Sequence, residues 1–317
     1  MKMITRGDQM TKIMSNYQEI ISFYSVKFTR VEVIESTNLV LKLVDEVNNV
    51  YILKEKRDLQ KVMLNHELTT WLGKFDINVP QSLLTKDGLP YLVSENKYYM
   101  ITKYIEGDII SDEEVIANVG VFGEVLAKLH IALEQFEMSG QTTDMDLLHD
   151  INNWAYSSIE KENAYDLSKV KEILDDEFSK MIKSLKTQYI HRDYHPGNVI
   201  FKDGNLGGII DLDITTKGLK IFDVCYFLTS MLARMYPLKD GKEQWFDLIP
   251  PYLKAYQQHN QLTLTELQII PKMMISIELI FAAWFISVED HENTKYTYDL
   301  LDFLIENIVR VDATLER

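Results

Sequence analysis

The residues most able to do chemistry lie close together in the stretch YIHRDYHPGNVIF, residues 189–201. It contains two histidines, an arginine, an aspartate and an asparagine. Alternate residues of a strand share a face, so His191, Asp193 and His195 could form a metal site of imidazoles and a carboxylate. The Pro-Gly pair that follows ends such a strand and favours a loop. A metal-dependent hydrolase built on these three residues is one hypothesis.

A second polar group follows in GGIIDLDIT, residues 207–215. The apolar run predicts a buried strand that carries Asp211 and Asp213 on one face near its end. A charge there is costly unless it is paired or binds a cation. Asp193, Asn198 and Asp211 offer only oxygen ligands, which suit magnesium better than zinc. Magnesium held by oxygen ligands indicates phosphate chemistry.

The third feature is Lys54, which lies inside the apolar run YILKEK. Taken alone, such a lysine is most often an edge or solvent-facing residue. The helix predicted to follow carries Glu67, however, and a strand lysine held by a helix glutamate belongs to the machinery of phosphoryl transfer. An Asp, an Asn and a second Asp, in that order, complete the set. We therefore predict a Lys54–Glu67 ion pair.

The elements that position these residues fall into two groups. Residues 1–106 are predicted to be mainly strands, with one helix; the strands are 28–35, 38–46, 49–56, 88–95 and 97–107, and the helix is 58–75. Ser111 and Glu114 form a capping-box pattern that opens a helical region. Short strands flank the polar stretch, and the chain from Ile221 onward is helical. This pattern predicts an α+β protein with a β-rich amino-terminal lobe, 1–106, and a larger, mainly helical lobe, 107–317.

Charge and composition restrict the partners. The net charge of −15 disfavours nucleic acid and anionic membranes and is compatible with a cationic substrate. The single cysteine excludes an intramolecular disulfide. The longest apolar run, 273–288, contains Glu278 and is shorter than the roughly 20 residues of a membrane span. No signal peptide is evident, so we expect a cytoplasmic protein.

Together the motifs resemble those of the aminoglycoside phosphotransferase and choline kinase family, small-molecule kinases that share the protein-kinase fold. HRDYHPGN resembles the catalytic loop of that family, and GIIDLD resembles its metal-binding strand. IFDVCYFL resembles the segment that usually follows, with Asp223 as a structural acid. GEVLAKLH resembles the helix before the insertion that shapes the substrate pocket. The resemblance extends roughly over residues 33–303 and implies a bilobal protein-kinase-like fold.

The resemblance also implies a role for each polar residue. Asp193 would orient or deprotonate the acceptor hydroxyl. Asn198 and Asp211 would hold Mg²⁺ against the β- and γ-phosphates of ATP or GTP. Lys54 would contact the α- and β-phosphates and would be positioned by Glu67.

Other expectations concern the nucleotide and the loop. The backbone near Thr102 and Tyr104 would hydrogen-bond the base. The first turn, IESTNLVLKL, has no glycine, so Ser36 and its neighbours would supply donors to phosphate. Asp213 is an additional or outer metal ligand in one interpretation. Arg192 stands where the family commonly has glycine.

The implied activity is transfer of the γ-phosphate of ATP or GTP to a hydroxyl of a small acceptor, which can be cationic. Aminoglycosides, choline, homoserine and sugars all stay open as acceptors. The short segment after Asp211 and the absence of an Ala-Pro-Glu motif disfavour a protein substrate. We therefore expect nucleotide and acceptor as ligands, with no nucleic-acid, membrane or protein partner. A catalytically inactive kinase-like nucleotide-binding protein is the alternative from another class.

Overall fold

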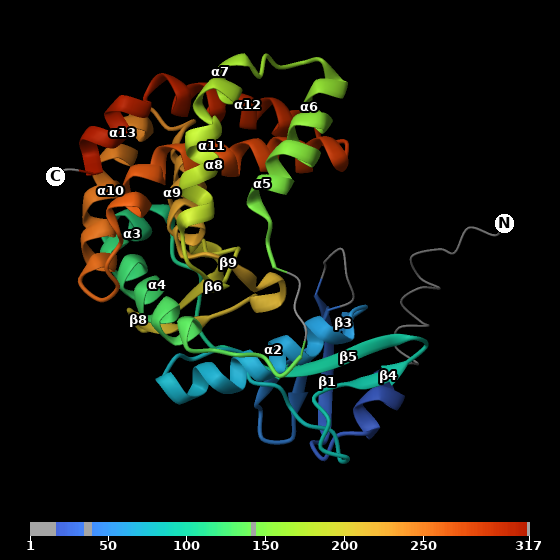
Figure 1. The fold of residues 1–317 in the computed structure, drawn as a ribbon. Coiled ribbons are helices and arrows are strands. Elements are labelled where there is room, and N and C mark those ends of the chain that lie inside the picture. Colours follow the sequence, from blue (N-terminus) through green and yellow to red (C-terminus); the bar gives the residue numbers. More distant parts are fainter. Residues whose placement is uncertain (1–16, 35–39, 141–143, 316–317) are drawn as a thin grey trace. The chain divides into compact units, whose positions relative to one another are not determined.

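The computed structural model describes residues 17–34, 40–140 and 144–315 (Figure 1). Two compact units make up the chain. The first comprises residues 1–107 with two later segments, 138–141 and 202–213. The second comprises residues 108–137, 142–201 and 214–317. Strands dominate the first unit and helices the second, which confirms the predicted α+β class.

The first unit is built on a five-stranded antiparallel sheet with the order β1-β2-β3-β5-β4. Its strands are β1 (Phe28–Ile34), β2 (Val40–Asp45), β3 (Val50–Lys56), β4 (Leu92–Ser94) and β5 (Lys97–Lys103). The turn between β2 and β3 forms at Asn48, which has a left-handed φ of 66°. Asp45 closes this turn, because its carboxylate accepts the N–H groups of Val47 and Asn49 at 2.9 and 2.8 Å.

The core of the first unit fixes the position of Lys54. Leu41, Leu43, Leu53 and Ile101 alternate along β2, β3 and β5 and are fully buried on one face of the sheet. Lys54 lies in β3 between Val40 of β2 and Met100 of β5. It is therefore on a central strand, which excludes the simple interpretation of Lys54 as an edge residue.

Helix α2 (Leu59–Leu72) follows β3 and matches the predicted helix. The side chain of Asp58 caps it by accepting the N–H groups of Gln60 and Lys61. Leu68 and Leu72 bury the inner face of the helix, so the register of α2 on the sheet is set by its apolar side chains.

The strand predicted over residues 209–215 is wrong. Strand β8 (Asn205–Ile209) ends before the aspartates, and a 3₁₀ turn, η4 (Leu212–Ile214), follows. Between them, Asp211 has a φ of 61°, a left-handed conformation that aspartate tolerates better than most residues. The chain therefore turns at Asp211, and the two aspartates do not share the face of an extended segment.

The second unit is mainly helical, and its helices and strands are α3 (Asp112–Ala117), α4 (Val119–Glu134), α5 (Leu147–His149), α6 (Tyr156–Glu162), α7 (Ser168–Ile173), α8 (Asp176–Ser184), β6 (Thr187–Ile190), β7 (Val199–Lys202), β9 (Thr216–Leu219), α9 (Lys220–Met235), α10 (Gly241–Gln257), α11 (Leu264–Ser287), α12 (His291–Glu306) and α13 (Ile308–Leu315). A π-helical segment, η2 (Asp150–Ala155), joins α5 to α6, and a 3₁₀ turn, η3 (Pro196–Asn198), precedes β7. Strand β9, which the sequence did not predict, pairs antiparallel with β6.

Local signals explain the first helices of this unit. The predicted capping box is confirmed, because Ser111 and Glu114 bond each other's backbone N–H groups at the start of α3. The chain then breaks at Asn118 before α4 begins. Helices α4 and α10 approach closely at Gly123, where a Cβ atom would lie 2.2 Å from the carbonyl oxygen of Tyr252. Only glycine fits that position without displacing the backbone of α10.

Helix α11 is longer than the apolar run predicted. In the described part of the chain, α11 is the one helix that is long and apolar enough to cross a membrane. However, 67% of its most apolar window is buried inside the protein. Helix α11 packs against α9 and α12, and its residues Met273, Met274 and Leu279 are completely buried. This is the behaviour of a core helix.

One charged group in α11 conflicts with its surroundings. Glu278 is only 4% exposed, and no described residue forms a hydrogen bond or ion pair with it. Burial raises the pKa of Glu278 to about 8. Burial raises the pKa values of Tyr226 in α9 and Tyr296 in α12, and a negative charge on Glu278 adds to this effect.

This burial predicts a pH-dependent stability. The pKa of Glu278 is higher in the folded protein than in the unfolded chain, so ionisation favours unfolding. The cost is absent below the unfolded pKa and grows as pH rises through the interval up to about 8. We expect Glu278→Gln to stabilise the protein by a few kcal/mol near pH ~8 and to have little effect near pH ~5.

Urea unfolding of the wild type and Glu278→Gln at both pH values measures this difference. Glu306→Gln, on the exposed face of α12, is the matched control and should show no such dependence on pH. An equal difference in stability at the two pH values would contradict the interpretation.

Candidate functional site

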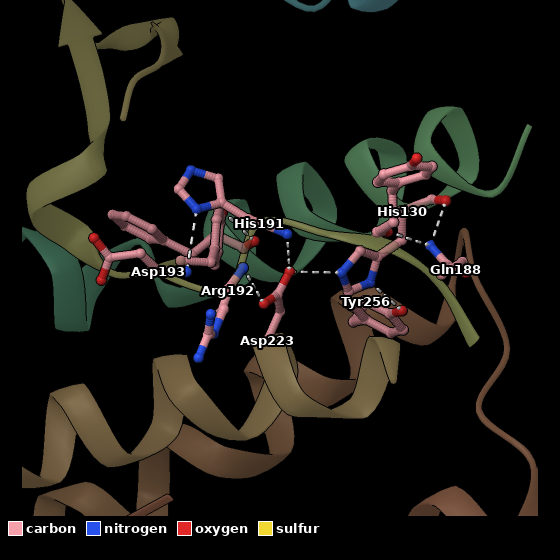
Figure 2. Close-up of polar contacts among 10 residues, drawn as sticks. His130, Gln188, His191, Arg192, Asp193, Asp223 and Tyr256 are labelled. Atoms are coloured by element: carbon pink, nitrogen blue, oxygen red, sulfur yellow. Dashed lines mark hydrogen bonds and ion pairs between the residues drawn. The ribbon is translucent and has the colours of Figure 1, made fainter. Parts of the chain in front are cut away.

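The loop between β6 and β7 is held by one buried carboxylate (Figure 2). Asp223, in the first turn of α9, is completely buried. Its two oxygens accept the backbone N–H groups of His191 and Arg192 at 2.7 and 2.8 Å. Because these are consecutive backbone donors, the carboxylate fixes the direction in which the chain leaves β6.

A second buried network fixes Asp223 itself. The Nε2 of His130, in α4, lies 3.1 Å from the Asp223 carboxylate, and its Nδ1 lies 2.8 Å from the hydroxyl of Tyr256. Since a carboxylate only accepts, Nε2 is the donor in its contact with Asp223. Gln188 donates to the carbonyl of His130 at 2.9 Å. His130 thus belongs to the buried network that supports the loop.

The unexpected arginine of the loop has an unusual backbone. Arg192 has a φ of 69°, in the left-handed region where glycine is favoured. This explains why a glycine suits the position and why arginine there carries strain. The hydrogen bond from its N–H to Asp223 holds the strained conformation. Burial raises the pKa of Asp150, and the positive charge of the Arg192 guanidinium opposes this rise.

Asp193, the residue predicted to act on the acceptor, is held through both carboxylate oxygens. The side-chain amide of Asn198 donates to Oδ2 at 3.0 Å and also to the Asp193 carbonyl at 2.9 Å. The hydroxyl of Tyr226 donates to Oδ1 at 2.5 Å. His195 Nε2 lies 3.6 Å from the same oxygen. The structure thus brings Asp193 and Asn198 together, and the Asp193 side chain is still 24% exposed.

The two loop histidines bond the loop backbone. Nδ1 of His191 accepts the N–H of Asp193 at 3.3 Å, and Nδ1 of His195 accepts the N–H of Gly197 at 3.1 Å. Among the described residues, no group of three or more His, Cys, Asp or Glu side chains is arranged to hold a metal ion. His191, Asp193 and His195 therefore do not form the metal site that the metal-dependent hydrolase hypothesis requires, and the two histidines bond the loop backbone instead.

A separate cluster of charges lies in the first unit. Lys54 Nζ lies 3.3 Å from Asp211 Oδ1 and 3.0 Å from Asp213 Oδ2. Lys56 also pairs with Asp213, and the amide of Asn65, in α2, donates to it at 3.3 Å. Burial favours the neutral acid, but the two ammonium groups outweigh it and hold the pKa of Asp213 below its usual range. Burial likewise opposes the charge of Lys54, and the two aspartates outweigh it and raise its pKa.

The predicted Lys54–Glu67 ion pair is not formed among the described residues. Glu67 instead accepts two hydrogen bonds from Ser139, from its N–H at 3.1 Å and its hydroxyl at 2.6 Å. The turn at Asp211 brings two carboxylates to Lys54, and they take the place expected for Glu67. The neighbouring Asn65, rather than Glu67, is the residue of α2 that reaches this cluster.

The residues predicted to contact the nucleotide base lie in and after β5. Thr102 is half-buried within the strand, and Tyr104 follows it. The Tyr104 N–H already donates to the Val50 carbonyl at 3.0 Å, so a base would have to use other backbone groups nearby. Ser36 lies outside the described residues. Base and phosphate contacts at these positions stay predictions.

The donor set of the first unit fits Mg²⁺. Asp211 and Asp213 present carboxylate oxygens around one position already occupied by ammonium groups, so the site attracts cations. Mg²⁺ is usually held by one or two carboxylates together with phosphates and water, without a closed protein cage. The assignment of Asn198 and Asp211 as metal ligands stays a prediction.

Three polar residues of these clusters were not predicted from the sequence as parts of the site. Tyr226 lies one helical turn after Asp223 in α9, so both point toward the loop. That spacing was a usable signal. Lys56 follows Lys54 by two residues in β3, so both side chains share one face of the sheet. Asn65 carried no sequence signal that separated it from other polar helix residues.

The sequence profile of the phosphotransferase enzyme family matches residues 30–263, most of the chain. The protein belongs to this family. Two homoserine kinases are similar in sequence. That of Bradyrhizobium sp. (strain ORS 278) is 23% identical over 236 residues, which cover 71% of this chain and 69% of the relative. That of Zymomonas mobilis subsp. mobilis (strain ATCC 31821 / ZM4 / CP4) is 22% identical over 202 residues, 61% of each chain.

Solved structures of phosphotransferases share the fold. Amicoumacin kinase in complex with AMP-PNP, Ca²⁺ and Ami has a TM-score of 0.73 at 16% identity, and the match covers 98% of this chain and 96% of that one. A microcompartment-associated aminopropanol kinase has a TM-score of 0.72 at 15% identity, covering 95% and 99%. Wild-type aminoglycoside 2'-phosphotransferase-IIIa in its GDP complex has a TM-score of 0.62 at 14% identity, covering 92% and 98%. The predicted kinase-like fold is confirmed.

The left-handed backbone of Arg192 gives a testable stability difference. Arg192→Gly and Arg192→Ala both remove the guanidinium, but only glycine relieves the strain of a positive φ. We expect the glycine variant to be more stable than the alanine variant by about 1 kcal/mol. At an ordinary helical or extended position, alanine would be the more stable of the two. Chemical denaturation of both variants measures the difference, and a more stable alanine variant would contradict the strain at this residue.

Proposed function

We propose that this phosphotransferase-family protein transfers the γ-phosphate of ATP or GTP to a hydroxyl group of a small molecule. Asp193 is the catalytic residue, and it orients the acceptor hydroxyl and takes its proton. Lys54 binds nucleotide phosphates, while Asp211 and Asn198 hold Mg²⁺. The backbone near Thr102 and Tyr104 hydrogen-bonds the base. The protein acts in the cytoplasm and uses no nucleic acid, membrane or protein partner.

This proposal rests on the orientation and the solvent exposure of the Asp193 carboxylate. Its carboxylate is oriented by two hydrogen bonds to different oxygens and stays partly open to solvent. A residue of purely structural importance would be enclosed, as Asp223 is. An oriented, accessible carboxylate beside an asparagine amide is suited to accept a proton from a hydroxyl.

Phosphoryl transfer asks for positioning and charge neutralisation more than for covalent chemistry. Mg²⁺ bound with the nucleotide would neutralise charge on the transferred phosphate. Lys54 supplies a further positive charge, and its raised pKa keeps it an ammonium ion at neutral pH. Asp213, which shares Lys54 with Asp211, keeps that ammonium group near the metal ligand. These groups together stabilise the transferring phosphoryl group.

The acceptor class we propose is an amino alcohol. The names of similar proteins, amicoumacin kinase, aminopropanol kinase, aminoglycoside phosphotransferase and homoserine kinase, support an acceptor with an amine and a hydroxyl. The net charge of −15 also favours a cationic acceptor. Homoserine is the second candidate, because both homoserine kinases match in sequence. Choline and sugars are further members of the panel to be tested.

The direct test is Asp193→Asn, which keeps the shape of the side chain and removes its basicity. We expect turnover to fall at least ~100-fold, because general base catalysis contributes on that order or more. Binding of Mg²⁺–ATP and Mg²⁺–GTP, measured by calorimetry, should stay within about twofold of the wild type, a change below ~0.5 kcal/mol.

The matched control is Asp203→Asn, the same change on an exposed turn with a positive φ that asparagine also tolerates. It should leave turnover and binding unchanged. Undiminished turnover in Asp193→Asn would remove Asp193 as the catalytic residue. Wild-type protein that binds nucleotide but phosphorylates no acceptor would favour the inactive nucleotide-binding alternative.

A further inference from the structure

The hydroxyl of Tyr226 forms the shortest contact to the Asp193 carboxylate. It donates to Oδ1 at 2.5 Å, while Asn198 donates to Oδ2 at 3.0 Å. The two donors come from different elements, the helix α9 and the 3₁₀ turn η3. Two donors on two oxygens prevent the carboxylate from rotating about its Cβ–Cγ bond.

We propose that Tyr226 is a positioning residue for phosphoryl transfer: its hydroxyl holds Oδ1 of Asp193 so that the remaining lone pairs of the carboxylate meet the acceptor hydroxyl. The proposal rests on the proposed kinase function. Nothing in the family motifs of the sequence singled out this tyrosine, and its assignment depends on the geometry alone.

The surroundings of Tyr226 keep its ring in place. The ring packs against Phe222 of the same helix, with centroids 6.0 Å apart, and against Phe281 of α11 at 5.6 Å. His195 approaches the ring from the loop at 6.4 Å. These ring contacts hold the hydroxyl where it donates to Asp193.

The position of Tyr226 in α9 gives it a second advantage. It lies three residues after Asp223, so both side chains leave the helix on the side of the loop. Asp223 fixes the loop backbone at His191 and Arg192, and Tyr226 fixes the side chain of the next residue, Asp193. One helix thus determines both where the catalytic carboxylate is and how it is turned.

The hydroxyl acts as a donor and does not itself take up the proton. Burial and the negative charge of Asp193 raise the pKa of Tyr226 far above neutrality, so the hydroxyl stays protonated at working pH. A hydrogen bond from a neutral hydroxyl to a carboxylate is short and strong. The proton released by the acceptor hydroxyl goes to Asp193. The acceptor oxygen forms a bond to the γ-phosphorus while the bond between that phosphorus and the leaving nucleotide oxygen breaks.

Tyr226→Phe tests the proposal, because it removes the hydroxyl and keeps the ring that packs against Phe281. We expect kcat to fall about tenfold or more, since an incorrectly turned carboxylate loses part of its effect as a base. The KM values for nucleotide and acceptor should stay within about twofold, a change below ~0.5 kcal/mol. A merely structural role would not separate kcat from KM in this way.

The matched control is Tyr296→Phe, in α12. Its hydroxyl donates to the carbonyl of Ala233 at 2.5 Å, so it loses a comparable hydrogen bond without contact to Asp193. It should keep wild-type kcat. Thermal unfolding of both variants establishes that each is folded at the assay temperature.

The outcomes distinguish a failure of the proposed kinase function from a failure of the positioning role of Tyr226. If the wild type phosphorylates an acceptor and Asp193→Asn does not, the proposed function stands and the Tyr226 variant is decisive. An unchanged kcat in Tyr226→Phe, or an equal loss in Tyr296→Phe, would overturn the positioning role. A wild type that transfers phosphate to no acceptor would remove the proposed function, and the positioning role with it.

Discussion

The buried carboxylate of Asp223 is the contact on which the rest of the catalytic loop depends. It accepts two consecutive backbone N–H groups and faces the imidazole of His130, so its charge is satisfied inside the protein. Removing one partner of such a buried group costs about 3–5 kcal/mol. That energy exceeds the strain of about 1–2 kcal/mol that a non-glycine residue bears at a left-handed φ. The loop can therefore hold Arg192 in a conformation that arginine alone would avoid.

The consequences of this constraint extend along the loop. With the backbone fixed at Arg192, the two oxygens of Asp193 are held by Tyr226 of α9 and by Asn198 of the turn η3. A separate cluster in the first unit keeps Lys54 charged between two aspartates. In the proposed function, Lys54 and Asp211 of the first unit would supply positive charge and a metal ligand, and Asp193 of the second unit would supply the base.

Much of this could be predicted from the sequence, because the signals are local. Apolar periodicity gave the strands around Lys54 and the helix after them, and the spacing of polar residues pointed to Asp193 and Asn198. The errors have a common cause. A left-handed residue inside an apolar run, as at Asp211, reverses the chain without changing its hydrophobic pattern, so a turn was mistaken for a strand. The partner of Lys54 was then wrong as well, because distant pairing depends on where such turns direct the chain.

Detection of the product by phosphorus NMR is the most direct test of phosphate transfer to a small-molecule hydroxyl. Wild-type protein with Mg²⁺ and ATP or GTP would be incubated with amino alcohols, homoserine, aminoglycosides, choline and sugars. We expect a new phosphomonoester resonance with at least one amine-bearing acceptor, in an amount equal to the nucleotide consumed. Binding of nucleotide with no phosphomonoester from any hydroxyl acceptor would contradict it.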